Sequence, residues 1–159
     1  EKDAVLFVTL NRPERRNPLS SDMIAALSEA IASGNASPDI RVIVIKATGP
    51  AFSAGHDLRE MRRRNDEDQS DWQARIDQLL RDCAAMMTSI LHAPKAIIAS
   101  VQGIASAAGC QLVSACDLAI ASDDATFSDP VVAFNVNGVE YFAHPFEARA
   151  GRDKRRDVF

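Results

Sequence analysis

Short apolar runs that alternate with amphipathic stretches constrain the fold of this chain more than any other feature of its sequence. The runs are rich in β-branched and aliphatic residues and occupy residues 4–10, 41–46, 96–101 and 118–121. Strands that alternate with helices in this way predict an α/β fold with a largely parallel sheet. The runs 41–46 and 96–101 are continuously apolar, which predicts strands buried on both faces.

Three helices are predicted between these runs. Residues 20–32 open with capping residues, carry apolar residues at helical spacing and close before Gly34. Residues 72–92 form a strong amphipathic pattern, and residues 108–115 predict a helix of small residues. Residues 62–70 are highly charged without an apolar period, which predicts a solvated, flexible loop.

Composition excludes several classes of protein. The 159 residues suffice for one domain, and the net charge of −4 with a pI near 5.3 argues against nucleic acid as the main partner. No apolar run approaches the roughly 20 residues of a membrane span. Cys83, Cys110 and Cys116 form neither a disulfide framework nor a metal-binding pattern, so we expect buried thiols, an intracellular protein and no metal site.

Two segments of small residues carry the chemical information. Residues 51–61 (AFSAGHDLREM) and residues 102–111 (QGIASAAGCQ) each lie where a β-rich run meets a helix. Backbone N–H groups near a helix start are free to point at a ligand. If the two junctions converge, two N–H groups can donate to one oxygen atom, which is the arrangement of an oxyanion hole.

These two segments resemble the signature segments of the enoyl-CoA hydratase/isomerase, or crotonase, family, and the resemblance extends from about Val5 to Glu140. It implies a single crotonase-like domain over residues 1–159, a spiral of ββα units with outer helices. The family's C-terminal helical region is missing, so we expect the chain to be the N-terminal core of a longer protein. With that region present, the resemblance implies a homotrimer or hexamer. A cytoplasmic location is expected, or the mitochondrial matrix if a leader was removed.

The resemblance also implies a substrate and two backbone donors. The substrate is an acyl-CoA thioester, with no separate cofactor, and its carbonyl oxygen would lie between the N–H groups of His56 and Ala108. Ala108 stands where most relatives have glycine. The His56 ring can act as an acid or base near neutral pH. The favoured alternative is that the ring hydrogen-bonds locally while only the N–H serves.

Basic residues near the first segment are candidates for holding the phosphates of CoA. Arg59 lies near the end of that segment, and Arg15 and Arg16 resemble the family's other nucleotide-side contact; a solvated surface explains these arginines equally well. Leu58 belongs to the same predicted binding segment. Asp57 is also placed at the binding site, although its main expected role is to cap the following helix.

The acidic residues of a standard hydratase are absent. The family has a glutamate in a Gly-Cys-Glu-Leu motif, and this chain has Gln111 at that position. Val131 stands where a second glutamate normally follows proline. Gln111 can orient a water molecule but cannot exchange a proton in that role. Hydration by two glutamates is therefore not expected. Glu140 is the candidate for an alternative catalytic acid, and Asp129 is a second candidate more typical of a turn.

Three functions remain open from the sequence. The preferred hypothesis is an enzyme that hydrates an enoyl-CoA or isomerises its double bond. The second is an acyl-CoA-binding module whose catalysis has lapsed, as the loss of both glutamates suggests. The third is a protease of the related Clp type with Ser106 as the nucleophile, and it is disfavoured because the chain has no G-x-S-x-G turn.

Overall fold

The computed structural model describes residues 4–128, 134–136 and 139–141, and the structural statements below concern these residues. The strands are β1 (Val5–Leu10), β2 (Val42–Ala47), β3 (Ala51–Ser53), β4 (Ala96–Val101), β5 (Ile104–Ser106), β6 (Leu118–Ala121), β7 (Phe127–Ser128), β8 (Phe134–Val136) and β9 (Val139–Tyr141). The helices are η1 (Pro13–Arg15), α1 (Ser21–Ala36), α2 (Leu58–Met61), α3 (Gln69–Leu91) and α4 (Ala108–Ala115).

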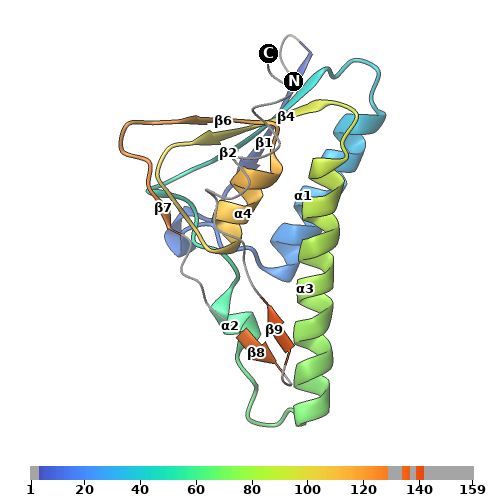
Figure 1. The fold of residues 1–159 in the computed structure, drawn as a ribbon, viewed down its shortest axis with the longest axis vertical. Coiled ribbons are helices and arrows are strands. Elements are labelled where there is room, and N and C mark those ends of the chain that lie inside the picture. Colours follow the sequence, from blue (N-terminus) through green and yellow to red (C-terminus); the bar gives the residue numbers. More distant parts are fainter. Residues whose placement is uncertain (1–3, 129–133, 137–138, 142–159) are drawn as a thin grey trace.

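Two parallel sheets organise the molecule (Figure 1). The larger sheet has the order β1-β2-β4-β6, and the smaller sheet has the order β3-β5-β7. A long strand, a short strand and a helix follow one another twice, as β2-β3-α2 and as β4-β5-α4. The α/β fold with ββα units that the sequence predicts is therefore confirmed.

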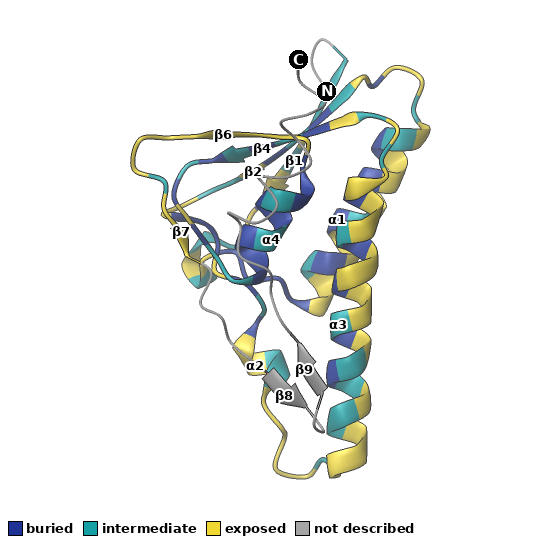
Figure 2. Ribbon diagram, in the orientation of Figure 1, coloured by how far each residue is buried: buried dark blue, intermediate teal, exposed yellow. Residues whose placement is uncertain are grey.

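The core lies between the larger sheet and the helices. Ile43, Ile45 and Ile97 point from the sheet into this core and are fully buried. Helix α3 packs against α1 and α4, and its buried residues recur at helical spacing as the sequence predicts (Figures 1 and 2). All three cysteines are free and buried, which confirms their expected place in the core.

The opposite face of the larger sheet is only partly covered. Phe7, Val44, Ile98 and Leu118 are direct cross-strand neighbours and form one apolar row across the four strands. Phe7 is 48% exposed and Leu118 is 54% exposed. The prediction that β2 and β4 are buried on both faces is therefore wrong for this face, because the helices cover only the other face.

Helix α1 continues further than the sequence predicts. It runs through Gly34 to Ala36 instead of ending before the glycine. A Cβ atom at Gly34 would lie 2.7 Å from Leu6 Cδ2 and 2.9 Å from Ile43 Cδ1. The glycine is therefore a packing point where the helix crosses the sheet, and it does not act as a C-terminal cap.

Hydrogen bonds tie the charged segment between α2 and α3 to α3. The Arg75 guanidinium donates to the carboxylate of Glu67 and to the carbonyl oxygens of Glu60 and Arg62. The Trp72 indole N–H donates to the Met61 carbonyl at 2.9 Å. The segment is largely exposed, as predicted, but an arginine of α3 fixes its path.

Candidate active site

The two small-residue segments meet backbone to backbone. A Cβ atom at Gly55 would lie 3.0 Å from the Ser106 carbonyl oxygen and 3.3 Å from the Ala108 backbone nitrogen. A Cβ atom at Gly109 would lie 2.4 Å from the Ser53 carbonyl oxygen. Glycine suits both positions, since a Cβ atom at Gly109 would overlap the Ser53 carbonyl oxygen and Gly55 has a φ of 89°, which other residues rarely adopt. The convergence that the sequence suggests is therefore present in the fold.

The backbone of His56 is oriented by a parallel bridge to Leu19. Leu19 donates to the Gly55 carbonyl at 2.8 Å and accepts from the Asp57 N–H at 3.4 Å. In a parallel bridge the residue between these two partners directs its own N–H away from the neighbouring strand. The His56 N–H therefore points away from Leu19.

The second candidate donor lies at the start of α4. Ala108 is the first residue of this helix, so its N–H is one of the groups without an intrahelical partner. Ala107 precedes it with φ 48° and ψ −123°, a conformation that favours glycine. The Ala107 N–H donates to the Ser128 carbonyl at 2.9 Å, which anchors this turn to β7.

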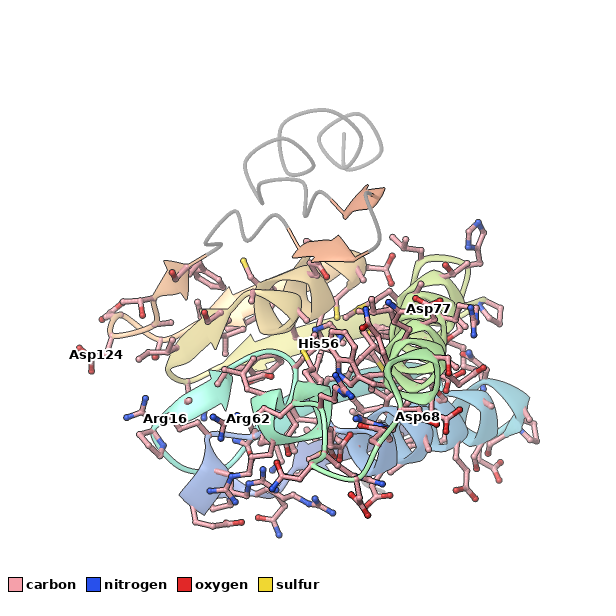
Figure 3. All side chains as sticks on the ribbon, turned by 90° about the horizontal axis from the view of Figure 1, so that it is seen from below. Arg16, His56, Arg62, Asp68, Asp77 and Asp124 are labelled. Atoms are coloured by element: carbon pink, nitrogen blue, oxygen red, sulfur yellow. The ribbon has the colours of Figure 1, made fainter. Side chains whose placement is uncertain are left out.

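The His56 side chain is half-buried. Figure 3 shows His56 near the centre of the view, between α2 and α4, whereas Arg16 lies toward the outer edge. Its Nε2 atom is buried and has no hydrogen-bond partner among the described residues. The local hydrogen bond expected for the ring is thus not found there. Burial lowers the pKa of His56 from its ordinary value of 6.5, because the charged imidazolium loses its hydration.

Asp57 serves two partners at once. Its Oδ1 atom accepts from the Arg59 N–H at 3.0 Å, which confirms the predicted cap at the start of α2. Its Oδ2 atom pairs with Arg15 Nη2 at 2.5 Å. The side chain of Asp57 is 5% exposed and that of Arg15 is 28% exposed, so the pair is largely buried. Sequence reasoning missed this pair because 42 positions separate the two residues.

The other predicted phosphate-side residues lie on the surface. Arg16, Leu58 and Arg59 are exposed, and Leu58 is 67% exposed. Arg16 is held in place by its backbone, whose carbonyl oxygen accepts from the Ala54 N–H at 3.0 Å. The structure thus brings Arg15, Asp57 and His56 together and leaves the three exposed residues at the rim, where their role in phosphate binding stays a prediction.

Asn17 is a structural residue of the site that sequence reasoning missed. It is fully buried, and its Nδ2 atom donates to the carbonyl oxygens of Thr48 and Ala51, each at 2.9 Å. Its Oδ1 atom accepts from the Arg12 N–H at 2.7 Å. Asn17 therefore fastens the loop that carries Arg15 to the turn before β3. The sequence offers no periodic pattern there that reveals this role.

The structure describes the remaining candidate residues to different extents. Gln111 is half-buried in the first turn of α4, three positions after Ala108, so the two share the beginning of that helix. Glu140 lies in β9 opposite Asn135, but its side chain, together with Asp129 and Val131, is outside the described residues. Ser106 ends β5, and no described histidine hydrogen-bonds to it.

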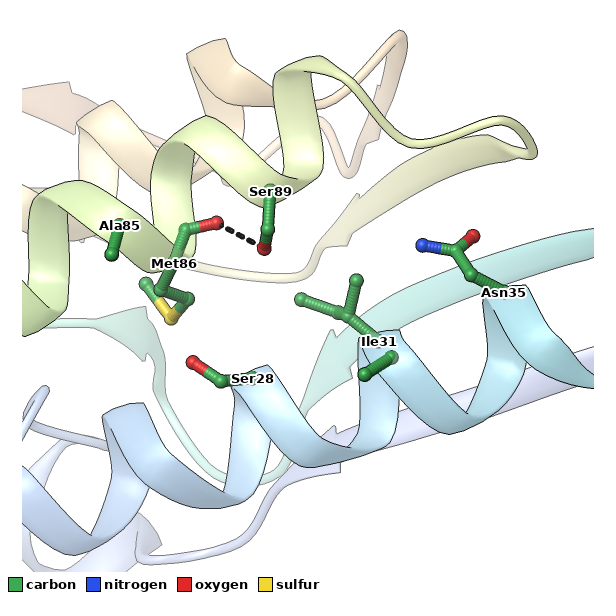
Figure 4. Close-up of a pocket in the computed structure, with 7 residues that line it drawn as sticks. Ser28, Ile31, Asn35, Ala85, Met86 and Ser89 are labelled. Atoms are coloured by element: carbon green, nitrogen blue, oxygen red, sulfur yellow. Dashed lines mark hydrogen bonds between the residues drawn. The ribbon is translucent and has the colours of Figure 1, made fainter.

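A groove of about 330 Å³ between α1 and α3 lies apart from these residues. Its lining comes only from the two helices, and the Ser89 hydroxyl donates to the Met86 carbonyl at 2.7 Å within it (Figure 4). None of the predicted site residues lines this groove.

The described part of the chain holds no group of three histidine, cysteine or acidic residues placed to bind a metal. None of its helices is long and apolar enough to cross a membrane.

Comparison with known proteins gives consistent matches. A family model described as enoyl-CoA hydratase/isomerase matches residues 1–154. The zebrafish (Danio rerio) mitochondrial enoyl-CoA hydratase domain-containing protein 3 is 42% identical over 105 residues, which cover 66% of this chain and 34% of that protein.

Solved structures agree with these matches. An enoyl-CoA hydratase/isomerase family protein from Silicibacter pomeroyi matches with 43% identity and a TM-score of 0.74, covering 82% of this chain and 53% of the other. Human enoyl-CoA hydratase domain-containing protein 3 matches with 40% identity and a TM-score of 0.73, covering 82% and 49%. The chain thus spans about half the length of these structures.

Proposed function

Because this chain belongs to the enoyl-CoA hydratase/isomerase family, we propose that it binds an enoyl-CoA thioester and stabilises its enolate between the N–H groups of His56 and Ala108. One observation carries the proposal. Gly55 and Gly109 bring the two segments into backbone contact, since a Cβ atom added at Gly55 would lie only 3.3 Å from the Ala108 nitrogen. Both candidate donors are then held near one another by the fold.

The chemistry follows from the position of the negative charge. Attack on the β-carbon of an enoyl thioester, or loss of a proton next to its carbonyl, places charge on the thioester oxygen. Two preorganised N–H donors stabilise that oxygen, and loss of one comparable donor costs on the order of 10²–10³ in rate. Because Ala108 begins α4, the helix dipole adds to the favourable field at this point.

The proposed reaction is hydration or double-bond isomerisation by a non-standard acid or base. Gln111 cannot replace a glutamate as a proton carrier, although its amide can orient a water molecule or the substrate. Glu140 remains a proposed catalytic group. Phosphates of CoA are proposed to contact Arg16 and Arg59 at the rim, with Arg15 oriented by its pair with Asp57.

The proposed reaction is tested by measuring whether water or deuterium from the solvent enters the product. The full chain is incubated in D₂O with short and medium enoyl-CoA thioesters, and the product mass is measured. Gain of water indicates hydration, and deuterium uptake without water indicates an isomerase-type proton shift. We expect one of these two results, with a lower rate for Glu140→Gln than for the parent. Folded protein that binds the thioesters and changes none of them contradicts the enzymatic proposal.

That last outcome would favour the second candidate function, a binding module for acyl-CoA. The presence of Gln111 at the glutamate position favours this candidate. An assembly of three or six copies and a mitochondrial location also remain proposals. The name of the zebrafish relative, which is a mitochondrial protein, supports the proposed mitochondrial location.

A further inference from the structure

The His56 ring is the feature of the site that its backbone role does not explain. A backbone donor needs no particular side chain, yet this position carries an imidazole whose Nε2 atom is buried without a hydrogen-bond partner among the described residues. Buried polar atoms in folded proteins are nearly always paired. An unpaired one at a candidate active site indicates that a ligand completes its hydrogen bonding.

The position of the ring favours the substrate as that ligand. The ring and the first candidate N–H donor belong to the same residue, and the bridge to Leu19 fixes that residue's backbone. A thioester oxygen bound to the His56 N–H would hold its neighbouring α-carbon beside the same residue. The imidazole is the acid–base group attached to the residue that carries this donor.

The acidic residues nearest to His56 in the sequence already have contacts of their own. Asp57, the adjacent residue, pairs with Arg15 at 2.5 Å. Glu60 of α2 accepts hydrogen bonds from the N–H and hydroxyl groups of Ser21. Helix α4 carries no charged residue. Burial is the cause of the lowered pKa of His56, so the ring is neutral at pH 7 and its unprotonated nitrogen is available as a base.

We propose that the His56 ring is the base that moves the proton in a double-bond isomerisation, an inference that rests on the proposed thioester-binding function. Nε2 takes a proton from the α-carbon of a 3-enoyl thioester, and the electron pair of the broken C–H bond delocalises into a dienolate. The N–H groups of His56 and Ala108 hold the dienolate oxygen. The imidazolium then delivers this proton, or in D₂O a deuteron exchanged for it from solvent, to the γ-carbon, which leaves the 2-enoyl thioester and a neutral ring.

The variants separate the ring from the backbone. His56→Gln and His56→Ala keep the backbone N–H and remove the exchangeable imidazole. We expect both to bind a short 3-enoyl-CoA thioester with an affinity close to that of the parent. We expect both to lose about 10²–10⁴-fold in the rate of isomerisation and of deuterium uptake in D₂O. His92→Gln is the matched control, because this exposed histidine ends α3 away from the site, and it keeps the parent rate.

A pH profile adds a readout that a merely structural role does not move. Because burial lowers the pKa of His56, the isomerisation rate of the parent should fall only at a pH below the ordinary imidazole range, where the ring becomes protonated, and the residual rate of His56→Gln lacks that fall. Parent-level turnover by folded His56→Gln overturns this inference alone. A parent that neither binds the thioester nor exchanges deuterium overturns the proposed function, and this inference with it.

Discussion

At the scale of single residues, the site depends on backbone conformations that its side chains do not favour. Ala107 has a φ of 48° at the turn into α4, where a Cβ atom is strained. Arg16 also has a positive φ of 61°, and Asn17 has a φ of 50°, which asparagine tolerates better than most residues. The site is thus held in shape by contacts such as the buried Asn17 hydrogen bonds, against local preference.

Replacing Ala107 with glycine should stabilise the protein. Glycine adopts this φ without strain, which stabilises the folded state. Its greater chain entropy in the unfolded state offsets part of that gain, so we expect a net increase of about 1 kcal/mol in the free energy of unfolding. The free energy of unfolding in urea measures the effect. Ala26→Gly, in the exposed middle of α1, is the control and should cost about 1 kcal/mol. A loss of stability in Ala107→Gly would show that the turn is not strained.

Replacing Gly109 with alanine should separate the two segments. The new methyl group would lie 2.4 Å from the Ser53 carbonyl oxygen, so the backbone must shift. We expect a loss of about 1–3 kcal/mol in the free energy of unfolding and weaker thioester binding in a calorimetric titration. Unchanged binding by this variant would mean that close contact of the segments is not required.

The sequence predicts the site unevenly at this scale. The two small-residue segments single out His56 and Ala108. The capping role of Asp57 follows from its position before a helix. The partner of Asp57 does not follow, because Arg15 reaches it from 42 positions away. Nor does the unpaired state of His56 Nε2, which depends on what the folded chain places around the ring.

At the scale of elements, the segment between α2 and α3 is organised by one carboxylate. Glu67 accepts from Arg75 Nε at 2.7 Å and from the Arg64 N–H at 3.0 Å. These hydrogen bonds lower the pKa of Glu67 from 4.5 to about 2. Since the folded pKa is the lower one, the stabilising contribution is present above pH 4.5 and is lost as the pH falls toward 2.

Arg75→Met should therefore loosen this segment at neutral pH. The variant removes the donors to Glu67 and to the carbonyl oxygens of Glu60 and Arg62. We expect a lower protection factor against hydrogen exchange at the Arg64 amide, and the protection factor in the parent should fall toward the variant's value on acidification toward pH 2. Arg81→Met is the control on the same helix, where the exposed side chain donates a hydrogen bond to Gln78. Equal exchange in the parent and Arg75→Met would contradict the account.

The elements themselves are mostly predictable from pattern. The bounds of β4, α4 and β6 coincide with the predicted ranges, because each is limited by sharp changes in residue type. The strands β3, β5 and β7 are two or three residues long, too short to show an alternation of apolar and polar residues. These unpredicted strands form the smaller sheet, and both candidate donors follow directly from it.

At the scale of the whole molecule, the alternation of strands and helices predicts the fold. It does not predict which face of the larger sheet the helices cover. The row of Phe7, Val44, Ile98 and Leu118 lies on the face opposite the helices, and Leu118 is 54% exposed. A continuous apolar run in the sequence does not distinguish a strand covered on both faces from one covered on a single face.

In the proposed site, two N–H groups polarise the carbonyl of a bound thioester. The most direct measurement is the infrared stretching frequency of that carbonyl, isotope-labelled at carbon, in a non-reactive acyl-CoA thioester bound to the full chain. Two N–H donors weaken the C=O bond, so we predict a lower frequency than in water and a smaller shift in Gly109→Ala. A bound thioester whose carbonyl absorbs at its solution frequency would contradict the claim.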